Sequence, residues 1–218
     1  MKKMINDPIT IVFLALSLLA SIIAYPSLPS SIVVHWGPSG EANNWMNKSM
    51  IFILFLFVLA LYLLFSFLPS FDKRGNLGKN PKTYRALLRS ITFTLLMLYL
   101  PILFIGLGFK VEVIKVFTIV FSILLIIMGN HYPQLKPNSL VGIKTKWTLA
   151  DEDTWRASHK VGGYASIIAG ALLFILSILL NQMGAAIAFV VILVVWATFS
   201  ITYSYIFFKS KHSNGRSL

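Results

Sequence analysis

Six long apolar segments, separated by shorter polar ones, follow one another along the chain of 218 residues. Each is close to the ~20 residues that a helix needs to cross the hydrocarbon core of a bilayer. We expect the spans at residues 8–25, 50–68, 88–109, 112–129, 162–180 and 185–208. The pattern therefore predicts an all-α membrane protein with six transmembrane helices.

Composition agrees with this fold class. Hydrophobic residues make up 57% of the chain and charged residues only 12%, whereas a soluble domain has about a quarter of its residues charged. The chain has no cysteine, which excludes disulfides, zinc sites with Cys ligands and a thiol nucleophile. We expect no cofactor and no metal site.

The first apolar segment follows Lys2 and Lys3 and so has the charge pattern of a signal peptide. However, no small-residue cleavage site lies near Tyr25 and Pro26, and further spans follow. We therefore expect an uncleaved first helix, capped by Asp7.

The net charge of +12 is distributed very unevenly between the two sides of the membrane. Loops facing the cytoplasm usually carry the excess of Lys and Arg. If the six spans are correct, one side holds only Lys48, Lys110 and Lys115, and the other side holds the remaining sixteen of the nineteen basic residues. This predicts a multi-pass protein of the bacterial plasma membrane with both termini in the cytoplasm, and it explains the positive charge without nucleic acid as a partner.

The central parts of the predicted spans contain no Asp, Glu, Lys, Arg or His. Ion-coupled transporters usually need such groups inside the membrane, so this argues against that class. Gly162, Ser166 and Gly170 recur every four residues, a spacing that lets two helices pack closely in lipid.

The predicted outer loop, residues 26–49, contains a candidate binding surface. Ile32, Val34 and Trp36 alternate with other residues as in a short strand, and residues 37–40 have the composition of a turn. The candidate contacts for a ligand from outside are His35, Trp36, Glu41 and Trp45. Alternatively, the Trp residues only anchor the loop at the membrane surface. His35 and Glu41 are too few ligands for a metal site.

The predicted inner loop, residues 129–163, begins with prolines that end the fourth span and continues into a helix. Thr148 followed by Asp151 resembles a capping box, so we expect the helix to start there and to run into the fifth span. Trp155 suits the zone of the lipid headgroups, which predicts a cytoplasmic interfacial helix between spans four and five.

An enzymatic reading would use His131, His159 and the acidic residues 151–153 as an acid–base or metal site. The acidic residues already suit the positive end of a helix, and the motifs HExxH and GxSxG are both absent. We therefore expect no enzymatic activity.

The two loops together carry a resemblance to a known family. In the inner loop, the order and spacing of seventeen residues resemble the signature of the SdpI immunity-protein family of Gram-positive bacteria: Gly129, Asn130, Lys136, Pro137, Asn138, Gly142, Ile143, Lys144, Thr145, Trp147, Thr148, Leu149, Trp155, His159, Lys160, Gly162 and Gly163. In the outer loop, Leu28-Pro29, His35-Trp36, Gly40 and Lys48 resemble a small N-terminal domain of unknown function that is found in the same family. The chain departs from the family where Lys144-Thr145-Lys146-Trp147 replaces the usual Arg-Thr-Pro-Trp, and where Lys160 replaces a common Arg.

The resemblance implies a membrane protein that protects its producer against a secreted peptide toxin of the SDP type, which dissipates the proton motive force. It also implies that some members act as receptors and hold a small cytoplasmic repressor at the membrane. We expect an N-terminal helix hairpin over residues 1–68 and a four-helix membrane region over residues 69–218.

The inner-loop residues expected to respond or to contact a partner or membrane lipids are Asn130, Pro137, Asn138, Gly142, Lys144, Thr145, Lys146, Trp147, Thr148, Trp155, Arg156, His159 and Gly163. The alternatives left open are a small-molecule or lipid transporter, a membrane enzyme and a scaffolding role.

Overall fold

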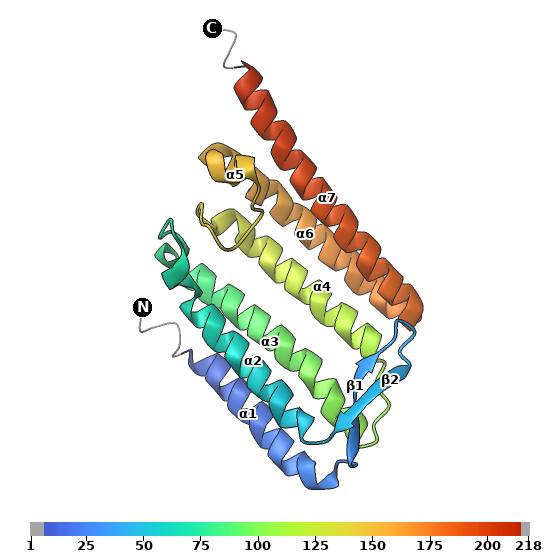
Figure 1. The fold of residues 1–218 in the computed structure, drawn as a ribbon. Coiled ribbons are helices and arrows are strands. Elements are labelled where there is room, and N and C mark those ends of the chain that lie inside the picture. Colours follow the sequence, from blue (N-terminus) through green and yellow to red (C-terminus); the bar gives the residue numbers. More distant parts are fainter. Residues whose placement is uncertain (1–6, 215–218) are drawn as a thin grey trace.

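The computed structural model describes residues 7–214, and within them six helices are long and apolar enough to cross a membrane. Figure 1 shows these helices side by side, with a β-hairpin at one end of the bundle and the short helix α5 at the other. The helices are α1 (Pro8–Ala24), α2 (Met50–Phe67), α3 (Pro81–Gly106), α4 (Val113–His131), α5 (Lys146–Ala150), α6 (Glu152–Leu179) and α7 (Gln182–Asn214). The strands are β1 (Ser31–Trp36) and β2 (Ala42–Asn47), and single 3-10 turns cover Tyr25–Ser27, Leu68–Phe71, Leu77–Lys79 and Tyr132–Gln134. The predicted six-helix fold is confirmed.

The bundle has two chemically different ends. We call the end with the start of α1, the end of α7 and the connections 68–80 and 132–151 the basic end, and the opposite end the hairpin end (Figure 1). Large apolar side chains face outward between them, including Ile23 and Ile168, which are each 68% exposed, and Leu179, which is 73% exposed. Such an exposed apolar belt is stable only against lipid. That the basic end faces the cytoplasm stays a prediction.

Three of the long helices begin with the same kind of N-terminal cap. The side chains of Asp7, Asn80 and Asp151 each accept a hydrogen bond from the backbone N–H of a threonine three residues later, at 3.1, 3.3 and 2.9 Å. Each cap satisfies a backbone donor at the helix start that has no partner within the helix. The predicted cap at Asp7 is confirmed. Its carboxylate is fully buried, and the hydrogen bond from Arg89 of α3 lowers the pKa of Asp7 to about 2.

Three helix boundaries differ clearly from the sequence prediction, and one of them is the end of α7, which lies at Asn214 and not at residue 208. α3 starts seven residues earlier than expected because basic residues in its first turns lower the hydropathy without disturbing the helix. The helix expected to start at Thr148 is instead two elements: Thr148 lies inside α5, and Asp151 caps α6. α6 then continues without interruption to Leu179, so the predicted run into the fifth span is confirmed, but its first turns are not a separate interfacial helix.

The outer loop forms an antiparallel hairpin. The predicted strand at Ile32–Trp36 and the turn after it are confirmed, whereas β2 was not predicted because its Ala-Asn-Asn-Trp-Met-Asn sequence lacks apolar alternation. The register pairs Val33 with Trp45 and His35 with Asn44, and an irregularity lies between these pairs. Leu28 and Ile32 are buried against the end of α3 and anchor the hairpin to the bundle.

The contact between α4 and α6 depends on glycine. A Cβ atom on Gly163 would lie 2.6 Å from the carbonyl oxygen of Gly129, and a Cβ atom on Gly170 would lie 2.6 Å from the carbonyl oxygen of Ser122. Ser166, between them, is fully buried. The predicted role in close helix packing is confirmed for Ser166 and Gly170. It is wrong for Gly162, which faces Ile143 of the connection before α5, while the neighbouring Gly163 makes the contact with α4.

Replacing Gly163 with valine is expected to lower the free energy of unfolding by about 1–3 kcal/mol, because the new side chain must push the two backbones apart. The measurement is thermal unfolding of the purified protein in detergent. Tyr164→Val, at the neighbouring lipid-facing position, is the matched control and should change the melting temperature little. Equal effects of the two substitutions would contradict the close contact.

Candidate functional site

At the basic end, residues 132–151 form an irregular segment that we call the signature loop (Figure 1). A buried segment without regular structure must pair its backbone N–H and C=O groups by other means. Here four buried side chains do so: those of Asp72, Asn138, Thr148 and His159.

Asn138 organises the first half of the signature loop. Its side chain is fully buried, and its Oδ1 accepts hydrogen bonds from the backbone N–H groups of Leu140 and Val141 at 2.9 and 2.7 Å. Its Nδ2 donates to the carbonyl oxygens of Lys136 and Val141 at 3.0 and 2.9 Å. All the hydrogen-bonding capacity of one amide is therefore used to fix one tight turn.

Asp72 holds the signature loop from outside it, from the connection between α2 and α3. Its carboxylate accepts hydrogen bonds from the backbone N–H and the hydroxyl of Ser139 at 2.9 and 2.8 Å. It also accepts from the backbone N–H groups of Asn76 and Leu77 at 2.8 and 2.9 Å. Burial alone would raise the pKa of Asp72, but the hydrogen bonds from Ser139 and Leu77 outweigh it and lower the pKa to about 2.

Further bonds join the same two connections. Asn76 donates its Nδ2 to the carbonyl oxygen of Pro137 at 2.7 Å, and Arg74 donates to that of Leu149. The signature loop is thus fastened to the α2–α3 connection along its length.

His159 of α6 holds the second half of the loop. Its Nε2 accepts a hydrogen bond from the backbone N–H of Ile143 at 3.0 Å, so the ring proton is on Nδ1, which donates to the carbonyl oxygen of Trp155 at 2.8 Å. Gly142, with φ of +118°, precedes this contact, and a side chain there would overlap His159 Nε2. The histidine acts here as a neutral structural group.

Trp155 lies in the core of this end and not at the membrane surface as predicted. It is 1% exposed, stacks on His159 with ring centroids 3.9 Å apart, and donates its Nε1–H to the carbonyl oxygen of Leu135 at 2.8 Å. The prediction of a headgroup contact was wrong because one tryptophan on a helix looks the same in sequence whether it faces lipid or a folded loop.

The short helix α5, inside the signature loop, contacts α7. Thr145 caps α5 and forms a reciprocal capping box with Thr148, whose hydroxyl also donates to the carbonyl oxygen of Ile143 at 2.9 Å. Trp147, half-buried, donates its Nε1–H to the hydroxyl of Ser204 at 2.6 Å and packs its ring against Tyr205.

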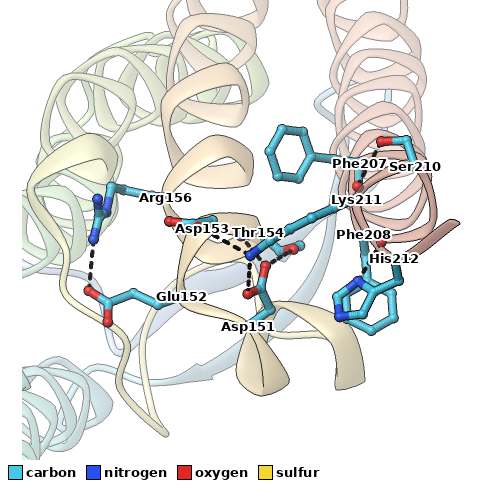
Figure 2. Close-up of polar contacts among 10 residues, drawn as sticks. All are labelled: Asp151, Glu152, Asp153, Thr154, Arg156, Phe207, Phe208, Ser210, Lys211 and His212. Carbon is cyan, nitrogen blue, oxygen red and sulfur yellow. Dashed lines mark hydrogen bonds and ion pairs between the residues drawn. The ribbon is translucent and has the colours of Figure 1, made fainter. Parts of the chain in front are cut away.

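Two of the three acidic residues after α5 bind the end of α7, as Figure 2 shows. Lys211 contacts Asp151 at 2.6 Å and Asp153 at 2.9 Å, and Glu152 pairs with Arg156 at 3.0 Å. Burial by itself would raise the pKa of Asp151, but the hydrogen bonds from Lys211 and Thr154 lower it to about 2. These acids and His159 therefore have structural partners, and the arrangement gives no support to the enzymatic reading.

A cleft of about 730 Å³ opens on the basic end beside this framework. Its lining includes the exposed cations Arg74, Lys136 and Arg156 and the single acid Glu152. Lys144 and Lys146 are exposed on the same loop. The cleft and these lysines form a surface that suits an anionic group or an acidic protein surface.

At the hairpin end, the four predicted contact residues differ in their exposure. His35 and Trp45 are exposed, and His35 Nδ1 lies 2.6 Å from Oδ1 of Asn43. Trp36 is half-buried and packs against the core between α1, α2 and α3. The exposed carboxylate of Glu41 accepts a hydrogen bond from Ser39, which lowers the pKa of Glu41.

The predicted inner-loop residues fall into an inner and an outer set. Pro137, Asn138, Gly142, Thr145, Trp147, Thr148, Trp155, His159 and Gly163 build the framework or the helix contacts behind it, while Asn130, Lys144, Lys146 and Arg156 are exposed. Three further residues, which were not predicted from the sequence, fix the loop from other parts of the chain: Asp72, Asn76 and Lys211. No pattern within a single segment could have identified them.

Two family models and one relative match the chain. Residues 134–204 match the model of the SdpI/YfhL protein family, and residues 12–61 match a domain of unknown function, DUF1648. The chain is similar to the immunity protein SdpI of Bacillus subtilis (strain 168), with 30% identity over 213 residues, which cover 96% of this chain and 97% of the relative. No solved structure shows significant similarity.

Asp72→Asn is expected to lower the free energy of unfolding by about 2 kcal/mol at pH 7, because the folded carboxylate has a pKa of about 2 against an ordinary value of 3.8. A lowered pKa stabilises the fold fully above the ordinary value, and the contribution disappears as the pH falls through the folded value. The difference in the free energy of unfolding between this variant and the unsubstituted protein, which we call the gap, should therefore shrink by roughly half at pH 3. Thermal unfolding in detergent from pH 7 to pH 3 measures this gap, with Glu152→Gln as an exposed control. A gap that does not change with pH would contradict this role of Asp72.

Proposed function

Because the chain belongs to the SdpI family of membrane immunity proteins, we propose that it protects the cell that makes it against a secreted peptide toxin of the SDP type. The observation that carries the proposal is the similarity to an immunity protein along nearly the whole chain, from the first span to the last. The two segments that resemble the family form the folded structures at the two ends of the bundle, as a toxin contact on one side and a response on the other would require.

The hairpin supplies the toxin contact in this proposal. Trp45 is 54% exposed and Met46 is 40% exposed, and both lie on β2 at the hairpin end of the molecule. Large apolar side chains on a small rigid element are suited to hold an apolar peptide. The half-buried Trp36 instead anchors the hairpin to the bundle.

In the same proposal, the basic end binds a cytoplasmic repressor in response to the toxin. Lys144, Lys146 and the cations of the cleft present positive charge on a framework that is fixed by buried hydrogen bonds. An acidic face of a small cytoplasmic repressor matches this surface, and binding would hold the repressor at the membrane.

Expression in a toxin-sensitive bacterial host should preserve the membrane potential after addition of SDP-type peptide, and Trp45→Ala should reduce this protection. The readout is a potential-sensitive dye, with protein levels in the membrane measured in parallel. Phe109→Ala, which removes another exposed ring at the hairpin end but outside the hairpin, is the matched control. Collapse of the potential in cells with normal amounts of the unsubstituted protein would refute immunity to this class of toxin. Full protection by the Trp45 variant would refute the contact.

The double change Lys144→Glu and Lys146→Glu should abolish recruitment of the repressor while protection is retained, because it reverses the charge of exposed residues and leaves the framework intact. The readout is the amount of repressor that sediments with the membranes, measured with and without toxin. Lys160→Glu, on the exposed face of α6, is the control for a general change in charge. Unchanged recruitment would show that the repressor does not bind these lysines.

A further inference from the structure

α7 is one uninterrupted helix of 33 residues that reaches both ends of the bundle (Figure 1). At a rise of 1.5 Å per residue it is about 50 Å long, whereas the hydrocarbon core of a bilayer is about 30 Å thick. It contains no proline, and its glycine is at the third position, so nothing in its central part favours a kink. Such a helix can move as one body.

At the hairpin end, the first residue of α7 contacts two other elements. Gln182 accepts a hydrogen bond through Oε1 from the backbone N–H of Ile114 at 3.1 Å, in the first turn of α4. The same side chain lies directly against Gly40 in the turn of the hairpin, where a Cβ atom would overlap its amide group. The tip of the hairpin thus rests on the start of α7.

At the basic end, the last turns of α7 hold the signature loop and the start of α6. Lys211 binds both Asp151, which caps α6, and Asp153 (Figure 2). Ser204 and Tyr205 hold Trp147 of α5. These four contacts would all change if α7 shifted along its axis or rotated.

We propose that α7 couples the hairpin to the signature loop, so that a ligand bound on the hairpin changes how Lys211 sits on the start of α6. In this coupling, a change at the polar contact of Gln182 moves α7, and the movement changes the ion pairs of Lys211. Its use in signalling rests on the proposed function, but the mechanical link itself does not.

The link can be measured in the purified protein without any toxin. The chain has no cysteine, so Lys146→Cys and Lys209→Cys introduce the only two sites for spin labels, one on α5 and one near the end of α7. Both positions are exposed. Pulsed electron paramagnetic resonance in lipid nanodiscs then gives the distribution of distances between the labels.

Lys211→Ala is expected to shift and broaden this distribution, and Gln182→Ala and Gly40→Ala should do the same from the opposite end of the molecule. Gly108→Ala is the matched control: its φ of +92° imposes similar backbone strain at the hairpin end, but no atom lies within 4 Å of the new Cβ. This control should leave the distribution unchanged. The pair Lys211→Glu with Asp153→Lys should partly restore the distribution that Lys211→Glu alone disturbs, because it restores one of the two ion pairs with the charges exchanged.

An unchanged distribution in Gln182→Ala and Gly40→Ala, with a shift in Lys211→Ala, would overturn the coupling. An unchanged distribution in Lys211→Ala would overturn the role of the ion pairs. Since neither result depends on toxin protection, failure of the coupling can be told apart from failure of the proposed function.

Discussion

The structure of the basic end depends on the pairing of backbone polar groups where regular helix stops. Leu140, Val141 and Ile143 lie in an irregular segment, and their N–H groups bind the side chains of Asn138 and His159. Unpaired buried groups of this kind are costly, so the side chains that pair them determine the path of the backbone. The signature loop therefore has one well-defined shape although it contains little secondary structure.

The need to pair buried backbone N–H groups also connects the signature loop to the membrane bundle. His159 can bind Ile143 because α6 is continuous from its cap at Asp151 to the last residue of the span. The position of α6 depends in turn on the close contact of Gly163 with Gly129 in α4. The shape of the loop consequently depends on the packing of α4 and α6, and a displacement of either helix would alter the loop.

The sequence was sufficient to predict the features that depend on neighbouring residues. The apolar spans, the cap at Asp7 and the turn after Trp36 each follow from local composition or spacing. It was not sufficient for contacts between distant segments. Asp72 is an isolated carboxylate in a basic connection until the fold brings it to Ser139, and Lys211 is one of two lysines in the last turns of α7. β2 was missed for a related reason, because its residues form a strand only through pairing with β1. Whether the exposed residues bind a toxin or a repressor stays a prediction, since exposure alone identifies no partner.

The structure also explains how this chain tolerates its departures from the usual family pattern. Lys146, where a proline is usual, is the first residue of α5, a position at which the backbone N–H has no partner within the helix. A proline and a lysine are thus both compatible with this position, and the Thr145–Thr148 capping box holds the turn without the rigid ring. Lys144, where arginine is usual, makes a single long contact of 3.4 Å to the carbonyl oxygen of Ser139, which does not require a planar group with several donors. Both departures therefore preserve the framework and change only the surface that a partner would meet.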